Sequence, residues 1–349
     1  MPVRITKPQV NIREKLSELE RPIGLNGSAL IRTDTPQEAF SLIGAGRKNL
    51  IINGDFSVSQ RGNYTSSTPI VHNVYYLDRW ISDVAGVTAT FRQITTDLPK
   101  QYRNLTNTGL RFEATSSSSN AYVGFRQKYE FMSGLDGKYV TVSAWVKSNK
   151  RAVIINYDGT GSNFKYAQHS GGGGWEYLSY TTYISSTSYN LFDIWLIDPI
   201  TYAYTPISSG DYVEVTNYQV EIGRVATPFE HRSYAEELAL CQRYYYKFRC
   251  ANQEWIYNES NASDGKWHQI YIGHPMRANP SVDVGNLATG GSVAGLSGVT
   301  ISSISPQTPG NTPGRISSRI TMSGTAGSAY NLHHTDAWQN NYIALSAEI

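Results

Sequence analysis

Charged residues, cysteines and long apolar runs are all scarce in this chain of 349 residues. Asp, Glu, Lys and Arg make up 17% of it, and the formal net charge is only +2. Such a balance gives no electrostatic reason to expect nucleic acid or an anionic membrane as a partner, because both call for clustered Lys and Arg. Two cysteines cannot form a disulfide framework, and no apolar run reaches the length of a membrane span. We therefore expect a chain made in the cytoplasm, without membrane insertion and without nucleic acid as a partner.

Tyrosine and glycine are abundant instead, with 25 and 30 copies. Both suit half-buried strands joined by many turns. Apolar and polar residues alternate along 139–147 and 191–197, which is the period of a strand with one buried face. The alternation in 211–223 changes phase near Asn217, which predicts a β-bulge. The sequence therefore predicts a mainly β protein.

Residues 1–48 differ in character from the rest of the chain and predict an N-terminal arm with two short helices. Capping-box patterns begin at Asn11 and Thr35. Helices this short are not stable alone, so they are expected to pack against another chain or, alternatively, to fold back onto the next domain. The residues expected to attach the arm to a particle are Ile12, Leu16, Leu19 and Phe40.

Three further regions come after the arm. Residues 49–232 contain many short predicted strands and turn clusters, which favour a jelly-roll β-sandwich whose first strand is 49–56. Residues 233–249 predict a linking α-helix with a capping box at Ser233 and an apolar stripe that packs on a domain or lines a subunit axis. Residues 250–349 predict a second, smaller β-sandwich that ends in a strand. The stripe consists of Leu238, Cys241, Tyr245 and Phe248.

Four stretches carry a resemblance to a known family: "TPQEAFSLIGAG" (35–46), "NLIINGDFSVSQRG" (49–62), "YYLDRW" (75–80) and "VEVTNYQVEIGRVATPFEHRSYAEELALCQRYY" (213–245). The chain resembles virion proteins of marine bacteriophages, usually described as tail fibres or receptor-binding appendages. Their middle part is similar to jelly-roll carbohydrate-binding modules that open with N-G-x-F and close with Q-x-E-x-G-x-x-A-T-P-F-E. The closing residues here are Gln219, Glu221, Gly223, Ala226, Thr227, Pro228, Phe229 and Glu230.

The resemblance implies a structural virion protein on the phage tail that attaches to a host surface glycan. The runner-up is a capsid head fibre or decoration protein, and a glycan depolymerase is a third alternative. Fibres that bind glycans gain from several weak sites acting together, so a homotrimer is expected. Other virion proteins are expected as partners through the arm. The module type also implies a possible structural calcium ion, with Asp55 and Glu230 as candidate ligands.

Catalytic and zinc signatures are missing from the sequence. The seven histidines show no metal-ligand spacing, and the adjacent His333 and His334 would face opposite sides of a strand. Carboxylates such as Asp193 occur, but their spacing does not indicate the pair that glycoside hydrolysis requires. Asp78-Arg79-Trp80 is interpreted as a packed corner with an Asp–Arg pair. We therefore expect neither an enzyme nor a cofactor other than the possible calcium ion.

Sugar binding calls for aromatic rings that stack on a pyranose, together with polar groups for its hydroxyls. Trp145 and Trp195 fall on the polar phases of their strands, which core packing does not demand, and Trp175 follows a glycine run. The last hundred residues hold further tryptophans and long Gly/Pro/Ser/Thr loops, and an end far from the arm would meet the host first. We therefore expect recognition in 250–349, with the sandwich face as the competing site. The candidate glycan-binding residues are Trp145, Trp175, Trp195, Trp255, Trp267 and Trp338.

Overall fold

The computed structural model describes most of the middle of the chain and parts of its last hundred residues. The described ranges are 48–99, 108–130, 134–157, 165–184, 191–196, 205–249, 258–259, 266–271, 276–278, 280–283, 300–306, 315–323, 329–330 and 342–348. The predicted arm, with Ile12, Leu16, Leu19 and Phe40, lies outside these ranges apart from Lys48.

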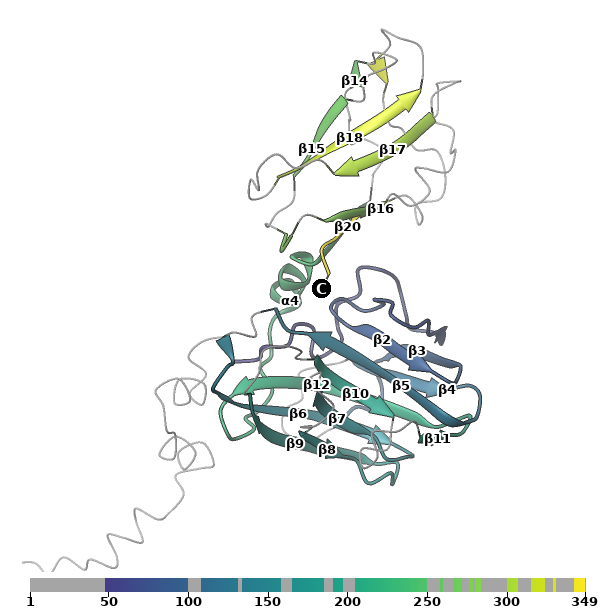
Figure 1. Ribbon diagram of the computed structural model, residues 1–349, viewed down its shortest axis with the longest axis vertical. Helices are drawn as coiled ribbons and strands as arrows, with labels where there is room; N and C mark the ends of the chain where they lie inside the picture. The colour runs from purple at the N-terminus through teal and green to yellow at the C-terminus, as the bar shows by residue number, and fades with distance from the viewer. Residues whose placement is uncertain are drawn as a thin grey trace, which may run out of the picture.

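Two antiparallel sheets form a sandwich between Thr68 and Ile222 (Figure 1). We call them sheet A and sheet B. Sheet A has the order β1 (Thr68–Pro69), β3 (Ala89–Ile94), β4 (Gly109–Ala114), β12 (Tyr212–Ile222), β6 (Tyr139–Ser148) and β9 (Trp175–Tyr183). Sheet B has the order β2 (Ile81–Ala85), β5 (Ser118–Lys128), β10 (Leu191–Leu196), β7 (Val153–Tyr157) and β8 (Lys165–Gln168), with β11 (Thr205–Ile207) also paired to β5. The predicted fold class, mainly β with a jelly-roll-like sandwich, is confirmed.

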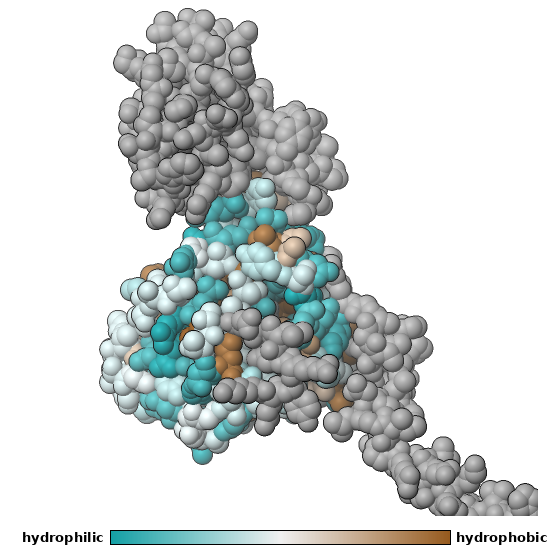
Figure 2. Space-filling view, turned by 180° about the vertical axis from the view of Figure 1, so that it is seen from behind, coloured by the Kyte–Doolittle hydropathy of each residue, from teal (hydrophilic) through white to brown (hydrophobic). Residues whose placement is uncertain are grey.

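The core lies between the sheets and follows the alternation of the sequence. Val142 and Val146 of β6 are fully buried, and so is Ile194 of β10. Phe112 of β4 and Phe125 of β5 meet across the core with ring centroids 5.7 Å apart. The part of the sandwich surface that is coloured in Figure 2 is mainly hydrophilic, with apolar residues scattered over it. The alternation of apolar and polar residues therefore predicted correctly which residues of these strands face the core.

The predicted bulge near Asn217 is confirmed. The register between β12 and β6 shifts between Thr216 and Gln219, and Asn217 has a φ of 55°. Asparagine tolerates this left-handed conformation better than most residues. The extra residue restores an inward direction for Tyr218, which is fully buried.

The predicted first strand, Asn49–Phe56, is wrong. Leu50 N donates to Val220 O at 2.8 Å, so the chain starts beside β12, but it then bends and turns without forming a ladder. Asn53 and Phe56 both have a φ of 60°, which no strand allows. Side chains of Asn49 and Asn53 bond the main chain in place of a neighbouring strand.

The predicted helix over 233–249 is too long. Helix α4 spans Tyr234–Gln242, and its capping box between Ser233 and Glu236 is confirmed. The chain then enters β13 (Tyr245–Arg249), so Tyr245 and Phe248 lie on a strand and do not continue the stripe that begins with Cys241. The run "YYKFR" has a strong strand preference, and pairing with a distant strand decides its structure.

The strands after α4 form smaller antiparallel sheets. The first joins β13, β20 (Tyr342–Ser346) and β16 (Ser281–Asp283); the second joins β15 (Lys266–Tyr271), β18 (Arg315–Ser323) and β17 (Thr300–Pro306); the third pairs β14 (Asn258–Glu259) with β19 (Ala329–Tyr330). The predicted strands of this region, including the final one, are confirmed, and a separate sandwich domain over 250–349 stays a prediction. The C-terminal residues return to α4, however, and β15, β17 and β18 lie farther from the sandwich (Figure 1). No helix in the described part of the chain has the length and apolar character of a membrane span.

Candidate functional site

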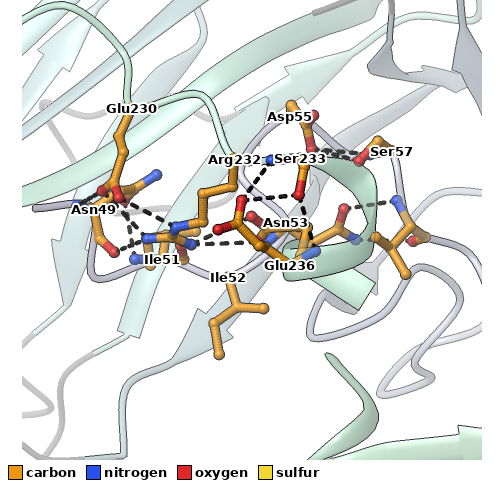
Figure 3. A network of polar contacts seen from close by, with 12 residues as sticks. Asn49, Ile51, Ile52, Asn53, Asp55, Ser57, Glu230, Arg232, Ser233 and Glu236 are labelled. Atoms are coloured by element: carbon orange, nitrogen blue, oxygen red, sulfur yellow. Dashed lines mark hydrogen bonds and ion pairs between the residues drawn. The ribbon is translucent and has the colours of Figure 1, made fainter. Parts of the chain in front are cut away.

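The residues that carry the family resemblance form a structural network, which Figure 3 shows from close by. Asn53 accepts from Val58 N at 2.9 Å and donates to Asp78 O at 2.9 Å. Its own carbonyl accepts from the indole N–H of Trp80 at 2.8 Å. One asparagine thus organises the turn that opens the sandwich.

The closing motif folds back over β12 and fastens the opening segment. Glu221 accepts from Thr227 N at 2.8 Å, and Gln219 accepts from Glu230 N at 2.8 Å. Glu230 in turn accepts from the backbone N–H groups of Lys48 and Asn49, at 2.9 and 2.5 Å. The two motifs are therefore partners, although Asn49 and Glu230 are 181 residues apart in the sequence.

Arg232 completes this network. Its guanidinium donates to the carbonyl oxygens of Asn49 and Ile51 (Figure 3). It also pairs with Glu237 at 3.3 Å. Glu237 accepts from Asn53 N, and burial raises the pKa of its carboxyl group while Arg232 opposes the rise. The opening turn and the first turn of α4 are thereby held together.

Asp55 and Glu230, the predicted calcium ligands, both have hydrogen-bond donors as partners. Asp55 accepts from the hydroxyl of Ser57 at 2.8 Å. In the described part of the chain, no three His, Cys, Asp or Glu side chains gather as a metal site would require. Calcium at these two residues stays a prediction.

Asp78-Arg79-Trp80 is a packed corner, but its ion pairs are not the predicted one. Asp78 accepts from Gln60 N at 2.7 Å and lies 3.4 Å from Arg61. Burial raises the pKa of Asp78 to about 6, against the lowering effect of Arg61. Arg79 reaches Glu348 at 2.5 Å and stacks on Tyr244. The corner therefore joins the sandwich to the C-terminal residues.

The outer face of sheet A brings together aromatic residues from β6 and β9. Trp145 and Tyr177 are direct cross-strand neighbours with ring centroids 5.4 Å apart. Tyr177 is 44% exposed, and Trp145 is half-buried. Trp175, the next residue on this face of β9, donates its indole N–H to Asp97 O at 2.6 Å. Two of the predicted tryptophans thus share one face.

A row of charges runs beside these rings across the same face. Arg111 of β4, Glu214 of β12 and Lys147 of β6 are successive cross-strand neighbours, and Lys147 is opposite Trp175. Glu214 lies 2.5 Å from Arg111 and 3.4 Å from Lys147. A hydrogen bond from Lys147 to Asp97 raises the pKa of this lysine. The face combines a stacking surface with fixed donors and acceptors.

Trp195 lies on the opposite side of the molecule, on the outer face of sheet B. It is half-buried and packs against Tyr122 of β5, with ring centroids 4.8 Å apart. The backbone of Trp267 lies in β15, whereas Trp255 and Trp338 fall outside the described residues. Among the candidates that the structure describes, Trp145 and Trp175 therefore share one face of the sandwich, and Trp195 lies on the other face.

Tyr177, Arg111 and Glu214 were missed from the sequence. A signal did exist for Tyr177, because "WEYLSYTTY" alternates and puts it on the same phase as Trp175. Nothing local signals that β4 and β12 place Arg111 and Glu214 beside Lys147, because cross-strand neighbours come from sheet order.

Comparison with known proteins gives likeness of fold only. No protein-family model and no curated protein sequence matches the chain. Among solved structures, the enzymatically active domain of tailspike protein 4 from bacteriophage CBA120 is similar at 14% identity and a TM-score of 0.33, over 50% of this chain and 21% of that one. TmCBM61 in complex with beta-1,4-galactotriose is similar at 12% identity and 0.33, over 51% and 100%. A family 11 carbohydrate-binding module from Clostridium thermocellum matches at 13% and 0.27, over 46% and 98%.

Proposed function

We propose that this chain is a non-enzymatic glycan-binding protein of a phage particle and that the outer face of sheet A binds the glycan. The observation that supports this most directly is the pair of Trp145 and exposed Tyr177 beside the charged row of Arg111, Glu214 and Lys147.

A pyranose has an apolar face and a rim of hydroxyls. The rings of Trp145 and Tyr177 offer stacking area from rigid strands, which costs little conformational entropy on binding. Hydroxyls at the rim would meet Lys147 and Glu214, which hold each other in place at 3.4 Å. We expect this open face to bind in the millimolar to micromolar range, which corresponds to about −4 to −8 kcal/mol.

Weak sites become useful when several act together, because tethering raises the effective concentration of the second site. A homotrimer on a virion would provide this avidity. Only Leu238 and Cys241 of the proposed stripe lie on α4, so the trimer rests on the avidity argument and no longer on a helical axis.

The virion role rests on the sequence resemblance, with residues 1–48 as the attachment arm and the phage tail as the location. A head fibre or decoration protein would fit the same face and differs only in where the chain sits on the particle. Imaging an assembled particle with a labelled chain distinguishes the two.

The depolymerase alternative is disfavoured on this face. Glycoside hydrolysis needs two carboxyl groups placed on either side of a bound sugar, one of them free to donate a proton. Glu214 and Glu113 both pair with the same guanidinium of Arg111, at 2.5 and 2.7 Å. If the chain released reducing sugar from a bound polysaccharide, the depolymerase alternative would be favoured again.

The binding face is tested in the full chain by affinity electrophoresis through gels that contain host surface polysaccharide. The double variant Trp145→Ala with Tyr177→Ala should lose at least tenfold in affinity. The matched control is Tyr166→Ala, which removes a tyrosine that is 36% exposed on β8 of the other sheet.

The same variants should be compared as competitors of phage adsorption to cells. Wild type and Tyr166→Ala should block adsorption, and the double variant should not. Unchanged blocking by the double variant would remove sheet A from the proposal and favour recognition by residues 250–349, which stays a prediction. The part of that region farthest from the sandwich holds β15, β17 and β18, and the C-terminus itself lies beside α4 (Figure 1).

A further inference from the structure

We propose that the chain forms an ester bond within itself, between the side chains of Thr227 and Gln219, with Glu221 as the base that moves the proton. The bond would join β12 to the closing segment, which we define as residues 223–230. The reaction occurs once in each chain and acts on no outside substrate, so it goes beyond the proposed glycan binding and does not depend on it.

The three side chains meet where the closing segment folds back over β12. Gln219 and Glu221 lie two residues apart on this strand and share the face that points away from the core, to which Val220 between them belongs. Thr227 reaches both from the closing segment. Gln219, Glu221 and Thr227 are 0%, 1% and 7% exposed. This burial keeps out water, which would otherwise hydrolyse an ester.

Glu221 contacts both of the groups that would react. Its Oε2 accepts a hydrogen bond from the Thr227 hydroxyl at 2.6 Å, and its Oε1 accepts from Gln219 Nε2 at 2.9 Å. A carboxylate within hydrogen-bond distance of a hydroxyl is placed to take its proton as a general base. The contact with the amide places the same carboxyl group to give that proton to the leaving nitrogen.

The hydroxyl and the amide also lie close to each other. Thr227 Oγ1 is 3.5 Å from Gln219 Nε2, which is bonded directly to the carbonyl carbon Cδ. Atoms about to react are held about 3 to 3.5 Å apart, so the hydroxyl starts near this range. The last torsion of a glutamine side chain is broad, and a turn of the amide about it presents the face of Cδ to Oγ1.

Two further groups stabilise the charges that develop. The backbone N–H of Glu230 donates to Gln219 Oε1 at 2.8 Å, and this oxygen becomes negative in the tetrahedral intermediate. Lys48 Nζ donates to Thr227 Oγ1 at 2.8 Å and also to Pro228 O. Its positive charge therefore lies beside the oxygen that loses a proton.

The bonds balance without a co-reactant. Thr227 Oγ1 bonds to Cδ of Gln219 while its proton passes to Glu221. The C–N bond of the amide then breaks, and Glu221 gives the proton to the nitrogen, which leaves as ammonia. Glu221 ends as the carboxylate that it was, and no atom is oxidised or reduced. Escape of the ammonia opposes the reverse reaction.

The test is mass spectrometry of the full chain, purified in its folded state. The ester lowers the mass by one ammonia molecule. Trypsin cuts after Arg224, which lies between the two linked residues, so the ester should keep peptides 166–224 and 225–232 joined. Hydroxylamine cleaves esters and should release the two peptides, whereas an amide link survives it.

Three variants identify the groups. Thr227→Val keeps the shape of the side chain and removes the hydroxyl, so the joined peptide should disappear. Thr227→Ser is the matched control, because it keeps the nucleophile and should keep the joined peptide. Glu221→Gln removes the base and should lower the joined fraction at least tenfold. Thermal melting identifies any variant that fails to fold, and the valine and serine variants, which leave Glu221 in place, then decide.

Three outcomes overturn the inference. If the two peptides of folded wild type separate completely, no ester forms and the cluster is a hydrogen-bond network only. If Thr227→Val still loses ammonia, another group is the nucleophile; a link to Lys48 that resists hydroxylamine would identify this lysine, because burial lowers its pKa. An unchanged joined fraction in folded Glu221→Gln would refute the role of Glu221 as the base.

Discussion

Replacing Arg232 by alanine should destabilise the sandwich strongly, and much more than the same change at the exposed Arg224. Its side chain is 7% exposed and donates to the carbonyls of Asn49 and Ile51. It also pairs with Glu230 and Glu237, at 3.4 and 3.3 Å. The change removes all of these at once and leaves two carboxylates without their cation.

The size of the effect follows from burial. Removing one partner from a buried ion pair costs about 3 to 5 kcal/mol, mostly because the remaining charge stays desolvated. Glu237 is only 6% exposed, so the upper part of this range applies to it, while the more exposed Glu230 contributes less. With an m-value of about 2 to 3 kcal/mol per molar urea, a loss of about 4 to 5 kcal/mol should lower the midpoint by roughly 1.3 to 2.5 M.

The assay is urea unfolding followed by tryptophan fluorescence, since buried Trp80 bonds the carbonyl of Asn53 beside the network. Arg232→Lys keeps the charge but loses the planar fork, so it should lie between the alanine variant and wild type. The control is Arg224→Ala, an exposed arginine stacked 3.8 Å from the Tyr139 ring centroid, which should cost about 1 kcal/mol or less. A loss below about 1 kcal/mol for Arg232→Ala would refute the reasoning, because that is the size of an exposed ion pair.

Three further predictions concern buried ionisable groups. Burial raises the pKa of Asp193 from 3.8 to about 7, with Arg126 opposing the rise, so the folded state keeps a proton that the unfolded chain has lost between about pH 4 and 7. The contribution of Asp193 to the free energy of unfolding therefore falls as pH rises through this window. Asp193→Asn should become more stable relative to wild type as pH rises from about 4 to 7. A constant difference in unfolding free energy between the two proteins across that range would contradict this prediction. Glu348→Gln should lower hydrogen-exchange protection in β13 and β20 while the sandwich stays protected, because the change removes the charge that pairs with Arg61 and with buried Arg79; equal protection would show that the junction holds without it. Burial raises the pKa of the Cys241 thiol well above its usual value, so in a Cys250→Ser chain it should react with a thiol reagent only after unfolding; rapid labelling of the native chain would be inconsistent with its burial.

Local patterns in the sequence determined the elements whose physics is local. Alternation identified the inward residues of β6 and β10, the phase change at Asn217 identified the bulge, and Ser233 with Glu236 identified the start of α4. Each of these depends on neighbours within a few residues, because side-chain direction and capping are set by backbone geometry.

Elements whose structure depends on residues far away in the sequence could not be predicted from local patterns. Helix α4 ends at Gln242 because the aromatic run after it pairs with β20, about a hundred residues later. The segment at Asn53 has a strand-like sequence but turns, since its polar groups find partners in Asp78, Trp80 and Glu237. In both cases tertiary contacts outweigh a local preference of a few tenths to one kcal/mol.

The candidate sites also depend partly on local sequence and partly on tertiary structure. The sequence by itself determined that Trp145 and Trp195 face away from the core, because strand period fixes the face of every residue. Only the tertiary structure decided that Trp145 adjoins Tyr177 and that Trp195 lies on the other sheet beside Arg126. A period assigns a side but not a neighbour, and neighbours across strands follow from sheet order and register, which distant segments set together.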